Sequence, residues 1–99
     1  MALTDRQRHY LRRLGHDLKP VVRTGSAGLS EAVLNELDIA LRDHELVKIK
    51  LVADDRPQRR AFIDAIGERL EAELVQSVGH VALFYRHNPD KKGAHIALP

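Results

Sequence analysis

The stretch PVVRTGSAGLSEAVLNELDIALRDHELVKIKLV, residues 20–52, decides the fold. It opens with an apolar pair, residues 21–22, which follows a proline and predicts a short strand. Residues 30–44 then repeat apolar side chains at helical spacing, and Ser30 is suited to cap the start of that helix. Residues 46–52 alternate between apolar and basic side chains, as in a half-buried strand. This order predicts a sheet with a helix packed against it.

The flanking sequence extends the pattern in both directions. Thr4 can cap a first helix over residues 4–14, which we expect Gly15 to close. A third helix is expected after the Asp54-Asp55 pair, with a buried stripe of Phe62, Ile66 and Leu70. Strands are predicted at residues 73–78 and 81–86, joined by a tight turn. The order α-β-α-β-α-β-β favours an α/β fold, a two-layer sandwich with a mixed four-stranded sheet.

The chain of 99 residues has the size of one domain. We expect this domain to occupy residues 1–86 and a polar tail to follow over residues 87–99. Residues 96–98 could add a short edge strand to the sheet. Neither a signal-peptide core nor an apolar run of the roughly 20 residues that span a bilayer is present, so we expect a cytoplasmic protein without membrane association.

Charge alternates along the chain in blocks. Residues 1–23 carry six basic and two acidic side chains, whereas residues 24–45 carry one and five. Residues 46–60 are basic again, with five against two. If the basic blocks meet on one face, that face would bind a polyanion; otherwise the charges only keep a small domain in solution.

Sequence signals for catalysis or metal binding are weak. The chain has no cysteine, which excludes thiol nucleophiles and cysteine-bound zinc. Its six histidines form neither an H-x-x-x-H nor an H-E-x-x-H set, and Asp54-Asp55 is explained as a helix cap. The interpretation is a protein that is not an enzyme and that needs no metal or cofactor.

The segment Gly25-Ser26-Ala27-Gly28 lies between the predicted strand and the Ser30 helix. Such a loop can expose backbone N–H groups beside a helix N-terminus, and glycines allow a sugar-phosphate backbone to approach closely. The alternative is a turn that needs positive φ at its glycines. Basic residues in the neighbouring sequence favour the first interpretation. The candidates for RNA contact are Lys19, Arg23, Lys48, Lys50 and Arg86, with Arg12 and Arg13 as outer contacts. Two alternatives stay open: Lys48 and Lys50 could only keep the sheet face soluble, and Arg86 could pair with a neighbouring carboxylate.

Four separated blocks, residues 18–22, 25–31, 44–50 and 79–86, together resemble the CRM domain, the chloroplast RNA splicing and ribosome maturation domain. Its stand-alone bacterial members are known as YhbY. The resemblance covers residues 4–86. It implies a fold similar to the C-terminal domain of translation initiation factor three.

The resemblance also implies RNA binding, with precursor large-subunit ribosomal RNA and the pre-ribosomal particle as partners. The family's G-x-x-G loop falls on residues 25–28. Members often carry a basic residue between the two glycines, whereas this chain has Ser26-Ala27, which shifts the electrostatic role to Lys19, Arg23 and their neighbours. The leading hypothesis is therefore a non-catalytic RNA-binding protein that assists assembly of the large ribosomal subunit.

Two further expectations concern partners. The chain has only four aromatic residues, so we expect recognition of the RNA backbone and shape and not stacking on bases; Tyr85 in particular is expected to be packed. The competing hypothesis is a protein-docking module that joins pre-ribosomal particles through a ribosomal protein or assembly factor. No heptad pattern suggests a dimer, and we expect a monomer.

Overall fold

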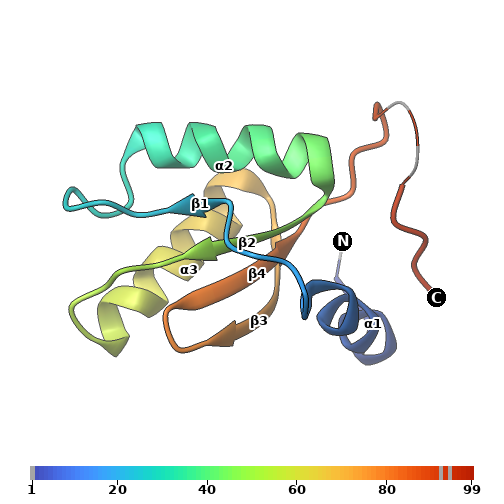
Figure 1. The fold of residues 1–99 in the computed structure, drawn as a ribbon, viewed down its shortest axis with the longest axis horizontal. Helices are drawn as coiled ribbons and strands as arrows, with labels where there is room; N and C mark the ends of the chain where they lie inside the picture. Colours follow the sequence, from blue (N-terminus) through green and yellow to red (C-terminus); the bar gives the residue numbers. More distant parts are fainter. Residues whose placement is uncertain (1, 92, 94) are drawn as a thin grey trace.

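The computed structural model describes residues 2–91, 93 and 95–99. Three helices surround a four-stranded sheet (Figure 1). The helices are α1 (Asp5–Gly15), α2 (Glu31–His44) and α3 (Arg56–Leu70), and the strands are β1 (Val22–Arg23), β2 (Leu46–Lys50), β3 (Glu73–Val78) and β4 (Val81–Tyr85). The predicted element order and the α/β class are confirmed.

The sheet is mixed, with strand order β1-β2-β4-β3. β1 runs parallel to β2, because α2 carries the chain back to the same end of the sheet before β2 begins. β4 is antiparallel to both β2 and β3, and the β3–β4 hairpin turns at Gly79, which has a φ of +57°. β1 and β3 are therefore the edge strands.

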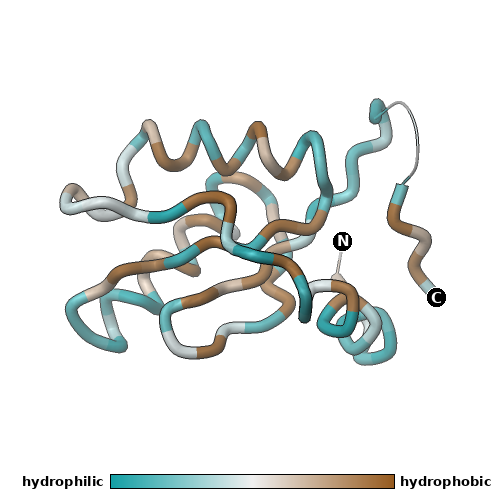
Figure 2. Tube along the Cα trace, in the orientation of Figure 1, coloured by the Kyte–Doolittle hydropathy of each residue, from teal (hydrophilic) through white to brown (hydrophobic). Residues whose placement is uncertain are grey.

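Helices α2 and α3 cover one face of the sheet. α2 contributes Val33, Leu34, Leu37 and Leu41, which recur at the spacing that places them on one side of a helix. α3 contributes Ile63 and Ile66, whereas Phe62 and Leu70 of the predicted stripe are only half-buried. The inward residues of β2 and β4 complete this core, and apolar segments follow both strands through the middle of the molecule (Figure 2).

Helix α1 lies against part of the opposite face. Its buried residue Leu11 packs with Leu46, Leu83 and Tyr85, which point away from α2 because side chains alternate along a strand. Tyr85 is buried, as predicted. The sandwich of sheet and two helices thus carries a partial third layer.

Helix ends follow the predicted caps. The Thr4 hydroxyl accepts a hydrogen bond from the Gln7 N–H, and the Gln7 side chain accepts one from the Thr4 N–H. Ser30 and Asp55 cap α2 and α3 by accepting from the N–H groups of Val33 and Gln58. The prediction that Gly15 follows and closes the first helix is corrected. Gly15 is the last residue of α1, and a Cβ there would lie 2.5 Å from the Leu83 side chain. The glycine is needed for the close approach of α1 to β4.

Four predicted strand limits differ from the structure. One is the end of β2, which lies at Lys50 and not at residue 52. The first strand is shifted by one residue, because Val21 is exposed and Arg23 pairs with Lys50. Arg86 lies just beyond β4. Residues 96–98 form no strand; instead Ile96 and Leu98 pack against the cluster under α1. Within the described ranges, the helices lack the length and apolar character needed to cross a membrane.

Candidate nucleic-acid interface

The 25–28 loop projects from one end of the molecule, between β1 and α2 (Figure 1). It is a tight turn closed by a hydrogen bond of 3.0 Å from the Gly28 N–H to the Gly25 carbonyl. Its base is fixed by Thr24, a buried polar residue. The Thr24 N–H donates to the Lys50 carbonyl over 3.0 Å, and its hydroxyl accepts from the Val52 N–H over 2.8 Å. The loop is therefore held in place by β2.

Glycine occupies positions 25 and 28 of the loop for different structural reasons. Gly28 has a φ of +70°, which favours glycine, and a Cβ there would lie 3.2 Å from the Phe62 ring. Gly25 has no positive φ, and a Cβ there would meet no atom within 4 Å. The turn requirement thus explains Gly28 but not Gly25, whose missing side chain leaves open space outside the protein.

The tip of the loop leaves hydrogen-bond donors free. In the described part of the chain, the backbone N–H groups of Ser26 and Ala27 have no protein acceptor, and both residues are exposed. On one side the loop borders a hollow of about 300 Å³, which is also lined by Asp54, Gln58 and half-buried Phe62. Since Asp54 repels an anion, a phosphate is favoured on the other side, toward β1.

Three of the predicted cations gather on that side. Arg23 pairs with Lys50 across β1 and β2, two residues before the loop. Lys19 joins them around a hollow of about 440 Å³, together with a single carboxylate from Glu36 of α2. Arg23 and Lys19 are exposed and Lys50 is half-buried. The structure thus brings together Lys19, Arg23 and Lys50 beside the loop.

Lys48 lies on the same sheet face as Lys50 but has structural contacts. Its ammonium donates to the backbone carbonyls of His16 and Leu18, over 3.3 and 2.9 Å. These bonds hold the segment that connects α1 to β1. Lys48 contributes positive charge to the face while its hydrogen bonds are used inside the protein.

Arg12 and Arg13 lie at the end of α1, next to the uncovered part of the sheet. They line a shallow hollow with His9, His16 and Gln76, and His16, Lys48 and Gln76 line the next one. We call this surface the basic face; it consists of Arg12, Arg13, His16, Lys48, Lys50 and Gln76. His16 and Gln76 were not predicted, because no sequence pattern places β3 beside the end of α1.

Arg86 lies at the other end of the sheet. The strand register pairs Lys50, near the loop, with the start of β4, whereas Arg86 follows its end. Its guanidinium donates to the Asp38 carboxylate over 2.7 Å, to the Asp38 carbonyl over 3.0 Å and to the Leu70 carbonyl over 3.1 Å. The side chain is 21% exposed. These contacts pair Arg86 with a carboxylate and with backbone carbonyls of the protein itself, and we do not include Arg86 in the interface.

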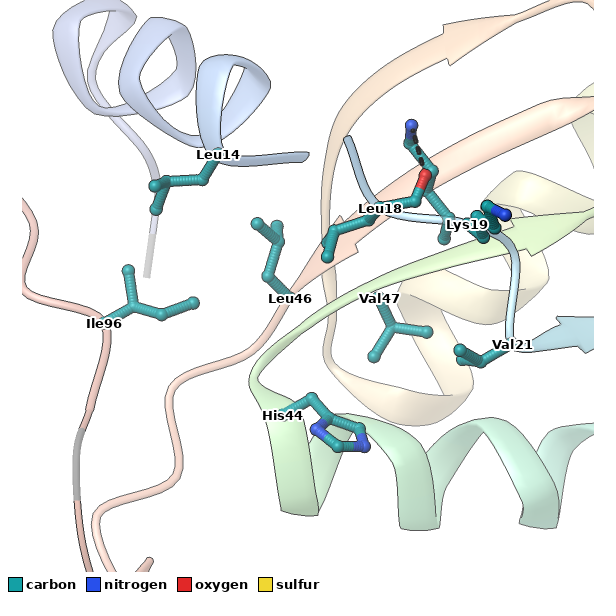
Figure 3. Close-up of a pocket in the computed structure, with 9 residues that line it drawn as sticks. Leu14, Leu18, Lys19, Val21, His44, Leu46, Val47 and Ile96 are labelled. Carbon is teal, nitrogen blue, oxygen red and sulfur yellow. Dashed lines mark hydrogen bonds between the residues drawn. The ribbon is translucent and has the colours of Figure 1, made fainter. Parts of the chain in front are cut away.

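A separate apolar hollow of about 370 Å³ lies between α1, β2 and the C-terminal tail (Figure 3). Leu14 and Ile96 border it on one side, and Leu18 and Val21 on the other. Leu14, Leu18 and Val21 are 41%, 40% and 57% exposed. His44, Lys19 and Lys48 supply its polar lining.

This geometry defines a class: small α/β domains in which a G-x-x-G loop links a parallel edge strand to a helix. Residues 3–86 match the family model of the CRS1 / YhbY (CRM) domain, so the chain belongs to that family. The resemblance expected from the sequence is confirmed.

Individual relatives agree with this assignment. The probable RNA-binding protein PA4753 of Pseudomonas aeruginosa is 48% identical over 89 residues, which cover 90% of this chain and 86% of the relative. An RNA-binding protein of Haemophilus influenzae is 40% identical over 98 residues, 99% of this chain and 96% of the relative. The solution structure of SAV1595 from Staphylococcus aureus superimposes with a TM-score of 0.83 at 30% identity, covering 99% and 100% of the two chains.

Proposed function

We propose that this protein binds RNA through the 25–28 loop and the adjoining cations. Family membership and the names of the relatives support the class of ligand. The observation that carries the proposal is the loop itself. It combines open space at Gly25, free N–H groups at Ser26 and Ala27, and the cluster of Lys19, Arg23 and Lys50.

In the proposed complex, loop N–H groups and the Ser26 hydroxyl hold a phosphate and fix the position of the RNA backbone. Arg23, Lys50 and Lys19 neutralise the next phosphates. The basic face then extends the contact toward Arg12 and Arg13. Because Phe84 and Tyr85 are buried and Tyr10 and Phe62 are half-buried, base stacking contributes little and the RNA is recognised by its backbone and shape.

The proposal extends to a biological role, for which the family resemblance is the support. The protein acts without catalysing a reaction, as a cytoplasmic monomer. It binds precursor large-subunit ribosomal RNA within pre-ribosomal particles and assists their assembly.

The test is a salt titration of affinity for precursor large-subunit RNA, with wild type and the variant Gly25→Asp. A carboxylate at Gly25 repels the phosphate, and the Cβ that carries it meets no atom of the protein within 4 Å. Gly28 is unsuitable for this purpose because its positive φ would strain the fold. We expect wild type to lose affinity steeply with salt, by roughly 0.7 to 0.9 log units per phosphate contact for each log unit of salt.

The control variant is Asn35→Asp, which introduces the same charge at an exposed position of α2 outside the loop. We expect Gly25→Asp to bind at least tenfold more weakly and Asn35→Asp to bind like wild type. Equal affinity of all three folded proteins would refute the role of the loop.

A second candidate function is favoured by the apolar hollow of Figure 3. Its exposed leucines and valine, with only basic polar neighbours, suit an apolar segment of an acidic ribosomal protein or assembly factor. If this docking dominates, the protein joins pre-ribosomal particles without affinity for bare RNA. Leu18→Ser would then abolish particle binding while Gly25→Asp would not.

A further inference from the structure

A second polar cluster lies at the opposite end of β2 from the loop, and the proposed RNA contacts do not use it. Its centre is Glu45, the residue between α2 and β2, which is fully buried. Glu45 has a φ of +63°, a left-handed conformation that is costly for a side chain of this kind. Its N–H donates to the Leu41 carbonyl, and its carbonyl accepts from the Arg86 N–H. The backbone therefore holds the carboxylate inside the protein.

The Glu45 carboxylate is surrounded by donors and imidazoles from the end of β4 and the tail. The Asn88 N–H donates to one oxygen, Oε2, over 2.8 Å, and the Ile96 N–H donates to Oε1 over 3.1 Å. The Nδ1 atoms of His87 and His95 each lie 3.1 Å from Oε2. Both carboxylate oxygens thus accept a backbone N–H, and Oε2 also faces the two imidazole nitrogens.

The hydrogen bond of His95 Nε2 determines whether His95 Nδ1 faces the Glu45 carboxylate with a hydrogen or with a lone pair. Nε2 lies 2.9 Å from the Lys91 carbonyl, which only accepts, so Nε2 carries the hydrogen. In a neutral ring Nδ1 then presents a lone pair to the carboxylate. Two acceptors facing each other repel, and a positive species between them removes the repulsion. That species is either a proton or a metal ion.

We propose that Glu45, His87 and His95 bind a divalent transition-metal ion, with zinc as the best match. The three ligand atoms lie within 4.8 Å of one another. A tetrahedral zinc ion with bonds of about 2.0–2.1 Å places neighbouring ligand atoms about 3.3 Å apart, close to the 3.1 Å between each Nδ1 and Oε2. The Lys91 carbonyl also fits, since a metal-binding histidine commonly donates its other N–H to such an acceptor.

The site would join three separate parts of the chain. Glu45 precedes β2, His87 follows β4, and His95 belongs to the tail. Ile96 and Leu98 pack under α1 directly after His95. A bound ion therefore fixes the tail to the domain and adds stability that depends on metal concentration.

The test uses tag-free full-length protein, freed of metal with a chelator and titrated calorimetrically with zinc chloride. We expect one zinc ion per chain, and magnesium or calcium bound at least 100-fold more weakly, because these ions prefer oxygen ligands. Saturating zinc should raise the melting temperature by at least about 4 °C.

His87→Ala and His95→Ala should each weaken zinc binding at least tenfold, whereas His80→Ala, at an exposed histidine of the β3–β4 turn, should not. His87 is half-exposed, so its removal tests the site even if His95→Ala releases the tail. Zinc should also shift the Nδ1 resonances of His87 and His95 in nitrogen NMR spectra. If wild type and both variants bind zinc equally, or if both Nδ1 atoms keep a hydrogen at saturating zinc, a proton alone occupies the cluster and the proposal fails.

Discussion

Single residues decide how the 25–28 loop is held and what it leaves free. Thr24 bonds through its N–H and its hydroxyl to the backbone of Lys50 and Val52, and these bonds fix the base of the loop against β2. Gly28 closes the turn in a conformation that other residues adopt only with strain. Neither residue needs to contact a ligand in order to matter for binding, because both determine where the Ser26 and Ala27 N–H groups point.

The two glycines give a matched pair of substitutions. Gly28→Ala should lower the free energy of unfolding by about 1–2 kcal/mol, because of its positive φ and the contact with Phe62. Gly25→Ala should change it by less than about 0.5 kcal/mol, because nothing lies within 4 Å. Urea unfolding of both variants measures the difference. A loss at Gly25 as large as that at Gly28 would mean that both glycines serve the turn.

The arginines form a second matched pair. Arg23→Ala should leave stability nearly unchanged and reduce the salt slope of RNA binding by about 1, since an exposed phosphate contact is lost. Arg86→Ala should instead lower stability by about 1–3 kcal/mol, because it removes the donor to Asp38 Oδ1 and to the Leu70 carbonyl, and only Arg42 remains on the other oxygen of Asp38. Unfolding and binding measurements on the same two proteins separate the roles. If Arg86→Ala leaves the free energy of unfolding unchanged, the contacts of Arg86 do not stabilise the fold and Arg86 is again a candidate for RNA binding.

At the scale of elements, the position of α1 depends on contacts made outside the helix. Gly15 allows its last turn to approach Leu83, and Lys48 binds the carbonyls that follow. Arg8 donates to the Leu74 carbonyl at the edge of the sheet. Through these contacts β2, β3 and β4 determine where Arg12 and Arg13 stand relative to the basic face.

Lys48→Met should loosen the connection between α1 and β1. The substitution keeps most of the apolar side chain and removes both hydrogen bonds to the carbonyls of His16 and Leu18. We expect a loss of about 1 kcal/mol and faster hydrogen exchange at the Leu18 and Val21 N–H groups. Exchange in the β3–β4 hairpin serves as the internal control. If exchange at residues 18–21 does not change, Lys48 acts only through its charge.

At the scale of the whole molecule, the net charge of +2 conceals a division between faces. The sheet face beside α1 gathers Arg12, Arg13, Lys48 and Lys50, while α2 and α3 cover the other face. A polyanion is attracted by this local charge and not by the net value.

Charge reversal on the basic face and on α3 tests whether the position of the charge matters for RNA binding. The double substitution Arg12→Glu with Arg13→Glu should weaken RNA binding at least tenfold and reduce the salt slope by about 2. The same reversal at Arg56 and Arg60, exposed residues of α3 on the other side of the sheet, should have a much smaller effect. Equal losses in the two double variants would show that only net charge matters.

Much of the fold follows from local sequence patterns. Thr4, Ser30 and Asp55 cap the helices as predicted, because capping depends on a hydroxyl or carboxylate within three residues of the N–H it accepts from. The β3 strand has its predicted limits, and β2 and β4 begin where expected. Periodicity finds such elements because it reflects burial on one side.

The interface was predictable only in part. The loop residues and their neighbour Arg23 are adjacent in sequence, and the family motif marks them. Lys48 and Arg86 were assigned to the RNA surface by charge and position, yet both donate to backbone carbonyls. Their acceptors lie at least 16 residues away along the chain, so no local pattern reveals them.

The sequence by itself determined the element order, the helix caps, the G-x-x-G loop and the family, because these depend on residues close together in the chain. Only the tertiary structure decided which cations are free and that Gly15 is a packing residue. It also brought Glu45, His87 and His95 together, up to 50 positions apart. The physical reason is that hydrogen bonds and ion pairs depend on distance in space, which the sheet order and the path of the tail set.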